Sequence, residues 1–357
     1  MRLLPLNLDL VEFPLVSIII PHYKGIETLS ECLDSVNIST YLNKEIIVVD
    51  NASGDGSPEW VQENHPDIIL VKNKLNEGYA GGCNRGAELA NGDFLMFLNN
   101  DTIHINNWVE LLVEEMLSNP NTAAVQPKIL NYYNTELFDY AGGCGGAIDV
   151  LAFPFARGRL FNSLEVDSKQ YDNEKNIFWA SGTALLVRKR DFNKAGKFDE
   201  TFFAHQEEID LQWKFHLMGR NVKVVPESVV YHKNAVTLPA KSIRKQYLNH
   251  RNSILMLISN YSLPIVLYFL PIRLALEIVA IVYALFLFDL RHIVGIIKSL
   301  AWILFHPKII YLRRQHTKNL RKVKDRDILS QMYKGSIVLD YFIFRKKNYR
   351  DLFPTPS

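Results

Sequence analysis

The stretch Glu45-Ile-Ile-Val-Val-Asp50 contains four consecutive β-branched residues and ends in a carboxylate. A short apolar run of this kind, followed by the polar turn of residues 51–57, predicts a buried β-strand. Comparable runs occur at residues 16–20, 68–71 and 94–98. Helical patterns lie between the runs, at residues 28–36 and after Ser57-Pro58. Strands that alternate with helices indicate βαβ units and a parallel sheet, so the predicted fold class is α/β.

Two aspartates end predicted strands. Ligands of open α/β sheets bind beyond the carboxyl ends of the strands, where Asp50 and Asp101 both fall. Asp50 could accept hydrogen bonds from a nucleobase or a ribose, or it could form only an Asx turn. The sequence Asn99-Asn100-Asp101 is either a simple turn or a set of oxygen ligands for Mg²⁺ or Mn²⁺ in contact with a diphosphate.

Glycines gather in two places outside the predicted strands. Residues 76–86 contain Gly78, Gly81, Gly82 and Gly86, a glycine-rich loop whose backbone could approach a ligand closely. Within it, Asn84 or Arg85 could contact ribose or phosphate. Because the spacing is not G-x-G-x-x-G, a dinucleotide-binding site is disfavoured. Residues 130–175 read as a long irregular segment of the kind found at active sites.

Three carboxylates, Glu207, Glu208 and Asp210, precede or begin a predicted helix at residues 209–218. The helix dipole favours acids at this end, which is a purely structural explanation. Alternatively, one of them is a general base, provided that burial or a neighbouring acid raises its pKa. His232 ends the apolar run that begins at Val229. It is either a structural histidine or, as a neutral imidazole, a metal ligand.

Composition limits the possible partners. A formal net charge of +2 over 357 residues argues against nucleic acid as the main partner. The three cysteines match no zinc-binding spacing, which favours a reducing compartment. The first sixteen residues contain Asp9 and Glu12 and lack a continuous apolar core, so we expect no signal peptide.

The last third of the chain differs in composition, which predicts one unit over residues 1–240 and a helical, membrane-associating unit over residues 241–357. Residues 263–288 are long enough to span a membrane but contain Arg273 and Glu277, which are costly in lipid. Basic residues flank this region on both sides, and residues 308–324 carry seven Lys or Arg and no acid. The positive-inside rule then disfavours a single span. Helices lying in the interface of an anionic membrane are the favoured interpretation, and a helical homo-oligomer contact is the alternative.

Taken together, these segments resemble glycosyltransferase family 2, and within it the bacterial rhamnosyltransferase-like branch. The resemblance covers residues 14–235. It rests on the order and spacing of several short motifs: Val16-Ser-Ile-Ile-Ile-Pro-His-Tyr23, Val48-Val-Asp-Asn-Ala-Ser53, Asn76-Glu-Gly-Tyr-Ala-Gly-Gly-Cys-Asn84, Phe97-Leu-Asn-Asn-Asp101, Ser181-Gly182, Gly196-Lys-Phe-Asp199, Glu207-Glu-Ile-Asp-Leu-Gln-Trp-Lys214 and His232. The family implies a GT-A fold, which is a Rossmann-like nucleotide-binding sheet with an acceptor-binding half.

The resemblance also implies roles for individual residues. Glu208 takes the place of the catalytic base, and Asp101 and His232 that of the ligands for Mg²⁺ or Mn²⁺. Donor-binding positions carried over in this way are Pro21, Tyr23, Asp50, Gly78, Gly82, Asn84, Asn100 and Gly182. Three positions depart from the family pattern: Asn99 replaces the first acid of the Asp-x-Asp motif, Glu208 replaces an aspartate, and Lys214 replaces an arginine.

The expected function is inverting transfer of a sugar from a nucleotide-sugar donor to a glycan or lipid-linked glycan acceptor in cell-surface polysaccharide synthesis. The first expectation for the donor is dTDP-rhamnose, followed by UDP-hexoses. The expected location is the cytoplasmic face of a bacterial plasma membrane, peripheral or shallowly inserted. A nucleotidyltransferase is one alternative, although Pro21-His-Tyr-Lys-Gly25 lacks its phosphate-binding pattern. A catalytically inactive membrane scaffold is the other.

Overall fold

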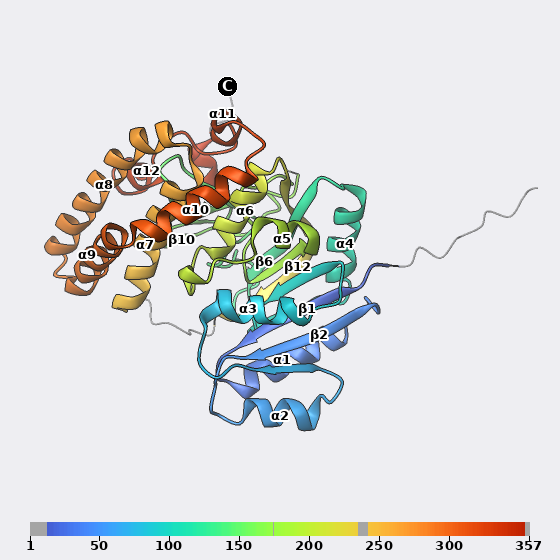
Figure 1. Cartoon of the computed structure of the whole chain (residues 1–357). Helices are drawn as coiled ribbons and strands as arrows, with labels where there is room; N and C mark the ends of the chain where they lie inside the picture. The colour runs from blue at the N-terminus through green and yellow to red at the C-terminus, as the bar shows by residue number, and fades with distance from the viewer. Residues whose placement is uncertain (1–12, 174, 235–241, 354–357) are drawn as a thin grey trace, which may run out of the picture.

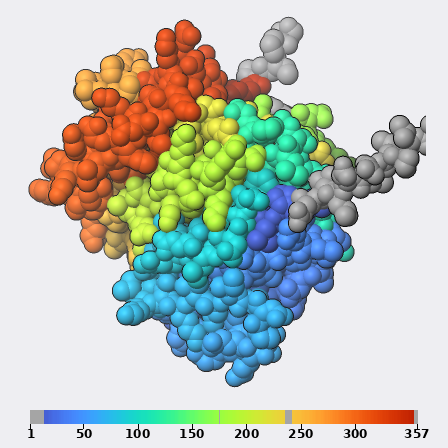
Figure 2. All heavy atoms as spheres, turned by 45° about the vertical axis from the view of Figure 1, so that its right-hand side comes forward, coloured from blue at the N-terminus to red at the C-terminus, as the bar shows by residue number. Residues whose placement is uncertain are grey.

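The computed structural model describes residues 13–173, 175–234 and 242–353. Asp9, Glu12 and the predicted unit boundary at residues 240–241 lie outside the described residues, as does Lys241, one of the basic residues that flank the apolar region in the sequence. Figure 1 shows a sheet flanked by helices in the first part of the chain, and a group of helices formed by the last third beside it. Figure 2 shows the same two regions as adjoining lobes of one surface.

The α/β prediction is confirmed. One sheet of eight strands has the order β3-β2-β1-β4-β11-β6-β12-β5. Within it, the pairs β3-β2, β2-β1 and β1-β4 are parallel. The strands of this sheet are β1 (Val16–His22), β2 (Lys44–Asp50), β3 (Ile69–Lys72), β4 (Phe94–Leu98), β5 (Thr102–His104), β6 (Thr122–Asn131), β11 (Ala184–Arg188) and β12 (Asn221–His232). The first strand continues through Pro21 to His22, because Pro21 and His22 still pair with Val49 and Asp50 of β2.

Helices cover both faces of this sheet, which explains why its strands are apolar runs without alternation. Ile19 faces α3 (Gly78–Leu89), α5 (Lys189–Ala195) and α6 (Glu207–Leu217). Its neighbours Ile18 and Ile20 face α1 (Ile26–Asn37), α2 (Ser57–Asn64) and α4 (Trp108–Ser118) on the other side. Successive side chains of a strand point to opposite faces, so one apolar run supplies both cores.

The prediction of a glycine-rich loop at residues 76–86 is wrong, because most of this segment forms helix α3. Its glycines allow the helix to lie close to the sheet. A Cβ atom on Gly86 would lie 2.3 Å from Ile19 Cγ2, and one on Gly82 would lie 2.8 Å from Asn51 Nδ2. Close packing against the strands outweighs the unfavourable helix propensity of glycine, which is about 1 kcal/mol per residue.

The segment predicted to be irregular is more ordered than expected. It begins with the end of β6 and then forms a second sheet of four short strands, whose members are β7 (Gly146–Ile148), β8 (Pro154–Ala156), β9 (Arg159–Leu160) and β10 (Ser163–Leu164). The indole of Trp179 covers Gly146, where a Cβ atom would lie 1.9 Å from the ring. The strands are too short to give a clear alternation of side chains, so no local pattern indicated them.

The last third of the chain is helical, as predicted. Its helices are α7 (Ile243–Asn260), α8 (Leu263–Phe286), α9 (Leu290–Phe305), α10 (Pro307–Leu320), α11 (Asp325–Leu329) and α12 (Ile337–Phe342), followed by a 3₁₀ turn at Tyr349–Leu352. Another 3₁₀ turn, Glu200–Phe202, precedes α6 in the first part of the chain. Buried residues of α7, such as Ile254 and Leu257, share a core with Trp213 and Leu217 of α6. The C-terminal helices and the sheet-bearing part are therefore joined by a common apolar core.

Among the described residues, α8 is the helix long and apolar enough to cross a membrane, and α9 with α10 would count as a second span only across a 74° bend. The charged residues of α8 are buried against protein. Arg273 Nη1 lies 2.5 Å from Glu277 Oε1, and Glu277 Oε2 lies 2.6 Å from His250 Nδ1 of α7. The opposite side of the helix is apolar and exposed, as at Leu267 and Ile278.

Candidate active site

The carboxyl ends of β1 and β2 place His22 beside Asp50 as register partners. Asp50 is buried, and its Oδ2 accepts a 3.3 Å hydrogen bond from the Ser53 amide. Its Oδ1 has no hydrogen-bond partner among the described residues. A buried carboxylate oxygen without a partner is costly, so it indicates a group that a ligand would satisfy. This is the position at which the sequence predicts contact with a nucleobase.

His22 connects this end of the sheet to the Asn99-Asn100-Asp101 turn. Its Nε2 lies 2.9 Å from Ser57 Oγ, and its Nδ1 lies 2.8 Å from Asn100 Nδ2. Burial lowers the pKa of His22, although the charge of Asp50 opposes this shift. A neutral imidazole can accept from Asn100 through Nδ1 and donate to Ser57 through Nε2. The structure thus brings together Asp50 and Asn100, which are separate in sequence.

Asp101 and His232 also meet, because β12 pairs with β5 and sets His232 opposite Thr102. His232 Nε2 lies 3.1 Å from Asp101 Oδ1, and His232 Nδ1 lies 2.9 Å from Asp139 Oδ1. Burial by itself lowers the pKa of His232, but Asp101 and Asp139 outweigh it and raise the pKa to about 10. The polar groups therefore form one row, from Asp50 through His22 and Asn100 to this charged cluster.

The donor set of Asp101 and His232 is compatible with a divalent cation bound together with a diphosphate. Mg²⁺ is commonly held by one or two carboxylates plus substrate phosphates, and a histidine ligand must first lose its proton. No group of three or more His, Cys, Asp or Glu side chains is arranged to hold a metal within the described residues. The remaining ligands would have to come from the donor substrate.

Glu208 lies in the first turn of α6, next to Glu207. One carboxylate oxygen of each, Oε2, lacks a hydrogen-bond partner among the described residues. Burial raises the pKa of Glu208 to about 7, and burial together with the charge of Glu208 raises the pKa of Glu207 as well. A carboxylate whose pKa lies near neutrality is suited to general base catalysis.

Gly182 is held next to the helix that carries Glu208. Gln212, one turn after Glu208, exchanges two hydrogen bonds of 2.6 Å with the backbone of Ala180. The Tyr79 hydroxyl donates a 2.5 Å hydrogen bond to the Gly182 carbonyl. β11 runs antiparallel to β4, and Ala184 at its start pairs with Leu98 at the end of β4. Gly182, which precedes β11, therefore lies near the carboxyl end of β4. The start of α3, Gly182 and the start of α6 therefore converge.

The other predicted donor-binding residues differ in their surroundings. Tyr23 is 38% exposed just beyond β1, and Gly82 packs beside Pro21. Asn84 is buried, and its side chain hydrogen-bonds the backbone of Phe198 and the carboxylate of Glu200. The side-chain amide of Asn84 is therefore hydrogen-bonded within the protein, whereas the Tyr23 side chain is accessible to a ligand.

Gly78 is required where α3 begins, because its φ is +74° and a Cβ atom would lie 2.2 Å from the Phe203 carbonyl oxygen. We expect Gly78→Ala to lower the free energy of unfolding by about 1–3 kcal/mol more than Gly54→Ala. Gly54 also has a positive φ, +64°, but no atom lies within 4 Å of the position that a Cβ atom would take there. Urea denaturation measures both variants, and equal losses would show that the contact with Phe203 is unimportant.

Sequence reasoning missed two residues of this site. His22 lies in the first of the motifs but had no predicted role, although its place directly after a buried strand was a usable signal. Asp139 lies in the segment predicted to be irregular, and nothing in its neighbourhood marks it. Its importance comes from the buried contact with His232, 93 residues away, which only the tertiary structure creates.

Comparison with known proteins identifies the fold and the family. Residues 17–183 match the family model described as "Glycosyl transferase family 2". The chain contains a family 2 glycosyltransferase domain. The match covers the row from His22 to Asp101 and ends at Thr183, and the recognition made from the sequence motifs is confirmed.

Curated relatives of this chain include a rhamnosyltransferase and a polysaccharide synthase by their names. The "N-acetylglucosaminyl-diphospho-decaprenol L-rhamnosyltransferase" of Mycobacterium tuberculosis is 23% identical over 66% of this chain and 81% of that protein. The "Poly-beta-1,6-N-acetyl-D-glucosamine synthase" of Staphylococcus epidermidis is 26% identical over 60% of this chain and 49% of that protein. These names support the glycosyltransferase prediction over the nucleotidyltransferase alternative.

A solved structure supports the fold assignment. The "Crystal structure of GalNAc-T7 with UDP, GalNAc and Mn2+" superposes with a TM-score of 0.60 at 18% identity, covering 90% of this chain and 58% of that one. At this identity the likeness concerns the fold alone. The predicted GT-A fold, with a C-terminal helical region, is confirmed.

Proposed function

We propose that this glycosyltransferase moves a sugar, with inversion, from a nucleotide-sugar donor to a hydroxyl group of a glycan or lipid-linked glycan used in cell-surface polysaccharide synthesis. The observation that carries the proposal is the polar row at the carboxyl edge of the sheet, which lies beside the start of α6 and begins at the Asp50 oxygen that has no partner in the described part of the chain. A nucleoside diphosphate could lie along this row, with the sugar directed toward Glu208.

In this mechanism Glu208 accepts the proton of the acceptor hydroxyl. The acceptor oxygen then forms a bond to the anomeric carbon from the side opposite the diphosphate. The bond between the anomeric carbon and the diphosphate oxygen breaks, and the electron pair leaves with the nucleoside diphosphate. A single displacement of this kind inverts the anomeric configuration. Asp50 binds the nucleobase, and Asn100 and Gly182 help to position the donor.

Asp101 and His232 would hold Mg²⁺ or Mn²⁺, with the surrounding ligands supplied by the donor. When bound, the cation neutralises negative charge on the leaving diphosphate. Asp139 acts behind His232 and fixes the orientation of its ring through Nδ1, as second-layer carboxylates commonly do for histidine ligands.

The donor is tested with purified full-length protein and a panel of nucleotide sugars, in Mg²⁺, Mn²⁺ or EDTA. We expect metal-dependent release of nucleoside diphosphate from one donor, with dTDP-rhamnose first because of the rhamnosyltransferase relative and UDP-hexoses next. Binding of each donor is measured in parallel. Folded protein that neither binds nor cleaves any donor would contradict the proposal and favour an inactive scaffold.

A pH profile tests the base. Glu208 must be deprotonated to accept a proton, and burial raises its pKa to about 7. Its ionisable neighbours Glu207, Tyr79 and Cys83 are all acids, so none supplies a positive charge that would lower the pKa of Glu208, and burial raises the pKa of each. We therefore expect the transfer rate to fall about tenfold per pH unit below pH 7 and to level off above it. A rate independent of pH between 5.5 and 7 would contradict this assignment.

We also propose that the protein works at the cytoplasmic face of a bacterial plasma membrane, with α8, α9 and the start of α10 lying in the interface. Large apolar side chains are exposed along this surface, at Phe286, Phe288, Leu290, Leu304 and Tyr311. The buried ion pair of Arg273 and Glu277 fits a helix that keeps one side on the protein better than a helix surrounded by lipid.

The basic cluster at residues 308–324 is only partly available for lipid headgroups. Arg313, Arg314 and Arg321 turn inward and hydrogen-bond protein groups. The exposed cations are Lys308, Lys318, Lys322 and Lys324. Flotation of the full chain with vesicles containing phosphatidylglycerol tests this arrangement, and the double variant Phe286→Glu, Phe288→Glu should lose binding. Unchanged flotation, or a stable oligomer that buries these residues instead, would contradict the membrane proposal.

A further inference from the structure

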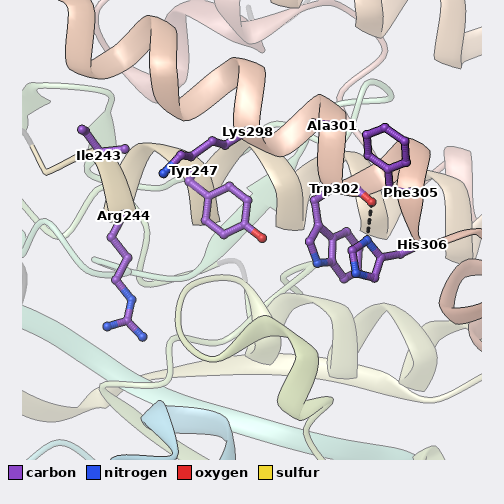
Figure 3. A pocket seen from close by; sticks show the side chains of 8 residues that line it. All are labelled: Ile243, Arg244, Tyr247, Lys298, Ala301, Trp302, Phe305 and His306. Atoms are coloured by element: carbon purple, nitrogen blue, oxygen red, sulfur yellow. Dashed lines mark hydrogen bonds between the residues drawn. The ribbon is translucent and has the colours of Figure 1, made fainter.

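A hollow of about 610 Å³ lies between α7 and α9. Figure 3 shows Arg244 and Lys298 at one end and the rings of Trp302, Phe305 and His306 at the other, with Tyr247 between them and the guanidinium of Arg244 pointing away from Lys298. The side chains that matter are Arg244, Tyr247, Lys298, Trp302, Phe305 and His306. No acidic residue is among those that line it within the described part of the chain. The hollow therefore combines positive charge with apolar surface.

The aromatic wall is fixed before any ligand arrives. The rings of Trp302 and His306 stack with centroids 4.3 Å apart and planes 11° apart, and His306 Nδ1 lies 2.8 Å from the Trp302 carbonyl oxygen. The buried guanidinium of Arg251 lies 5.0 Å from the Trp302 ring. Arg244 and Lys298, by contrast, are exposed and form no ion pair with another described residue. A preformed wall with adaptable cations suits an anion attached to an apolar chain.

The hollow adjoins the segment that leads to the proposed base. The guanidinium of Arg244 lies over the Phe203 ring, 4.0 Å from its centroid. Phe203, His205 and Gln206 all have positive φ, and α6 with Glu208 begins directly after them. Gln206 also donates a 3.3 Å hydrogen bond to the Asn249 carbonyl of α7. A ligand head at Arg244 would therefore lie on the side of the site from which an acceptor hydroxyl could reach Glu208.

The hollow also opens onto the apolar surface of α9. Ile297, Leu304 and Phe305 are 54%, 72% and 74% exposed. An apolar chain leaving the hollow could follow these residues into the lipid proposed to cover the same helices. Charge, aromatic wall and apolar exit are thus arranged in the order of an anionic head followed by a hydrocarbon tail.

We propose that this hollow binds the acceptor lipid, with its phosphate or diphosphate at the end that carries Arg244 and Lys298 and the first part of its hydrocarbon chain against Tyr247 and Trp302. The inference rests on the proposed function. It commits to the acceptor lipid rather than a bulk phospholipid because Arg244 contacts the segment that precedes the base. A bulk phospholipid would need no such position.

Calorimetric titration of the full-length protein tests the proposal, with farnesyl diphosphate as the probe. Inorganic diphosphate supplies the head alone, and farnesol supplies the tail alone. We expect farnesyl diphosphate to bind at least tenfold more tightly than either. Lys298→Glu should weaken this binding at least tenfold, because it places a negative charge beside the diphosphate. Arg244→Gln, a milder change, should weaken it in the same direction.

Lys318→Glu is the matched control, since it makes the same charge change on an exposed helix position that does not line the hollow. Equal loss in Lys298→Glu and Lys318→Glu would indicate general attraction of anions and would overturn the proposal. So would farnesyl diphosphate binding no tighter than diphosphate, or full competition by short-chain phosphatidylglycerol at equal concentration. Circular dichroism and thermal melting confirm that each variant is folded.

Failure of this inference is distinguishable from failure of the proposed function. Donor cleavage by the unchanged protein is measured in the same preparation. Donor cleavage without farnesyl diphosphate binding overturns the lipid site alone. Farnesyl diphosphate binding without donor cleavage or donor binding supports the lipid site and counts against the transferase mechanism.

Discussion

Replacing Glu208 by glutamine is expected to lower kcat by about 10²–10⁴-fold, the usual contribution of a general base. Glutamine preserves the size of the side chain but cannot accept the proton of the acceptor hydroxyl. The proposed donor site lies along the row from Asp50 to Asp101, so the affinity for the donor should change little. Steady-state transfer and equilibrium binding of the donor identified in the panel measure the two effects separately.

Glu207→Gln and Glu227→Gln complete this test. Glu207 is buried next to Glu208, whereas Glu227 is on the surface and paired with Lys175 at 3.6 Å. We expect Glu227→Gln to leave both donor binding and turnover unchanged, and Glu207→Gln to retain more turnover than Glu208→Gln. Normal turnover in Glu208→Gln, with its loss in Glu207→Gln, would reassign the base to Glu207.

Replacing Arg313 by methionine is expected to destabilise the protein by about 3–5 kcal/mol, as removal of one partner from a buried ion pair commonly does. Arg313 lies on α10, and its Nη2 is 3.0 Å from Asp210 Oδ1 on α6. It also pairs with Asp199. Burial raises the pKa of Asp210, but Lys214 and Arg313 outweigh it and lower the pKa to about 2. The variant would leave this buried carboxylate with Lys214 as its one remaining cation among the described residues.

Arg326→Met provides the comparison for Arg313→Met. Arg326 is 81% exposed and pairs with Asp327 at 3.3 Å, and such surface pairs contribute little. Urea denaturation of both variants gives the free energies of unfolding. A loss in Arg313→Met as small as that in Arg326→Met would show that the contact between α10 and α6 does not stabilise the fold.

The cluster around Asp210 joins the two predicted units, because its partners lie on C-terminal helices. Asp210 is two residues after Glu208 on the same helix, and it is held by Arg313 of α10 and by Asn260 of α7 at 2.8 Å. The C-terminal helices therefore hold the helix that carries Glu208, the proposed base, in addition to forming the surface that we propose contacts a membrane. We expect Arg313→Met to reduce the transfer rate even under conditions in which the variant remains folded.

The sequence by itself determined the four parallel strands β1 to β4, the order of the polar turns and the family. The runs ending at Asp50 and at Leu98 were readable because strand formation by β-branched and apolar residues is largely a local property. Their carboxyl ends had to meet, because parallel strands with right-handed connections share one edge. Asp50, Asn100 and Asp101 could therefore be expected at one site, and the structure brings them to the same edge of the sheet.

Only the tertiary structure decided the remaining features. Most of the glycine-rich segment 76–86 forms helix α3, because its glycines allow the helix to pack closely against the sheet. Asp139 gains its role through a contact with His232. Arg313 was one of seven cations in a basic tail until the fold placed it against Asp210. Each of these outcomes depends on burial between segments far apart in the chain. Burial changes the cost of a charge by several kcal/mol, which exceeds any local preference that a sequence pattern can display.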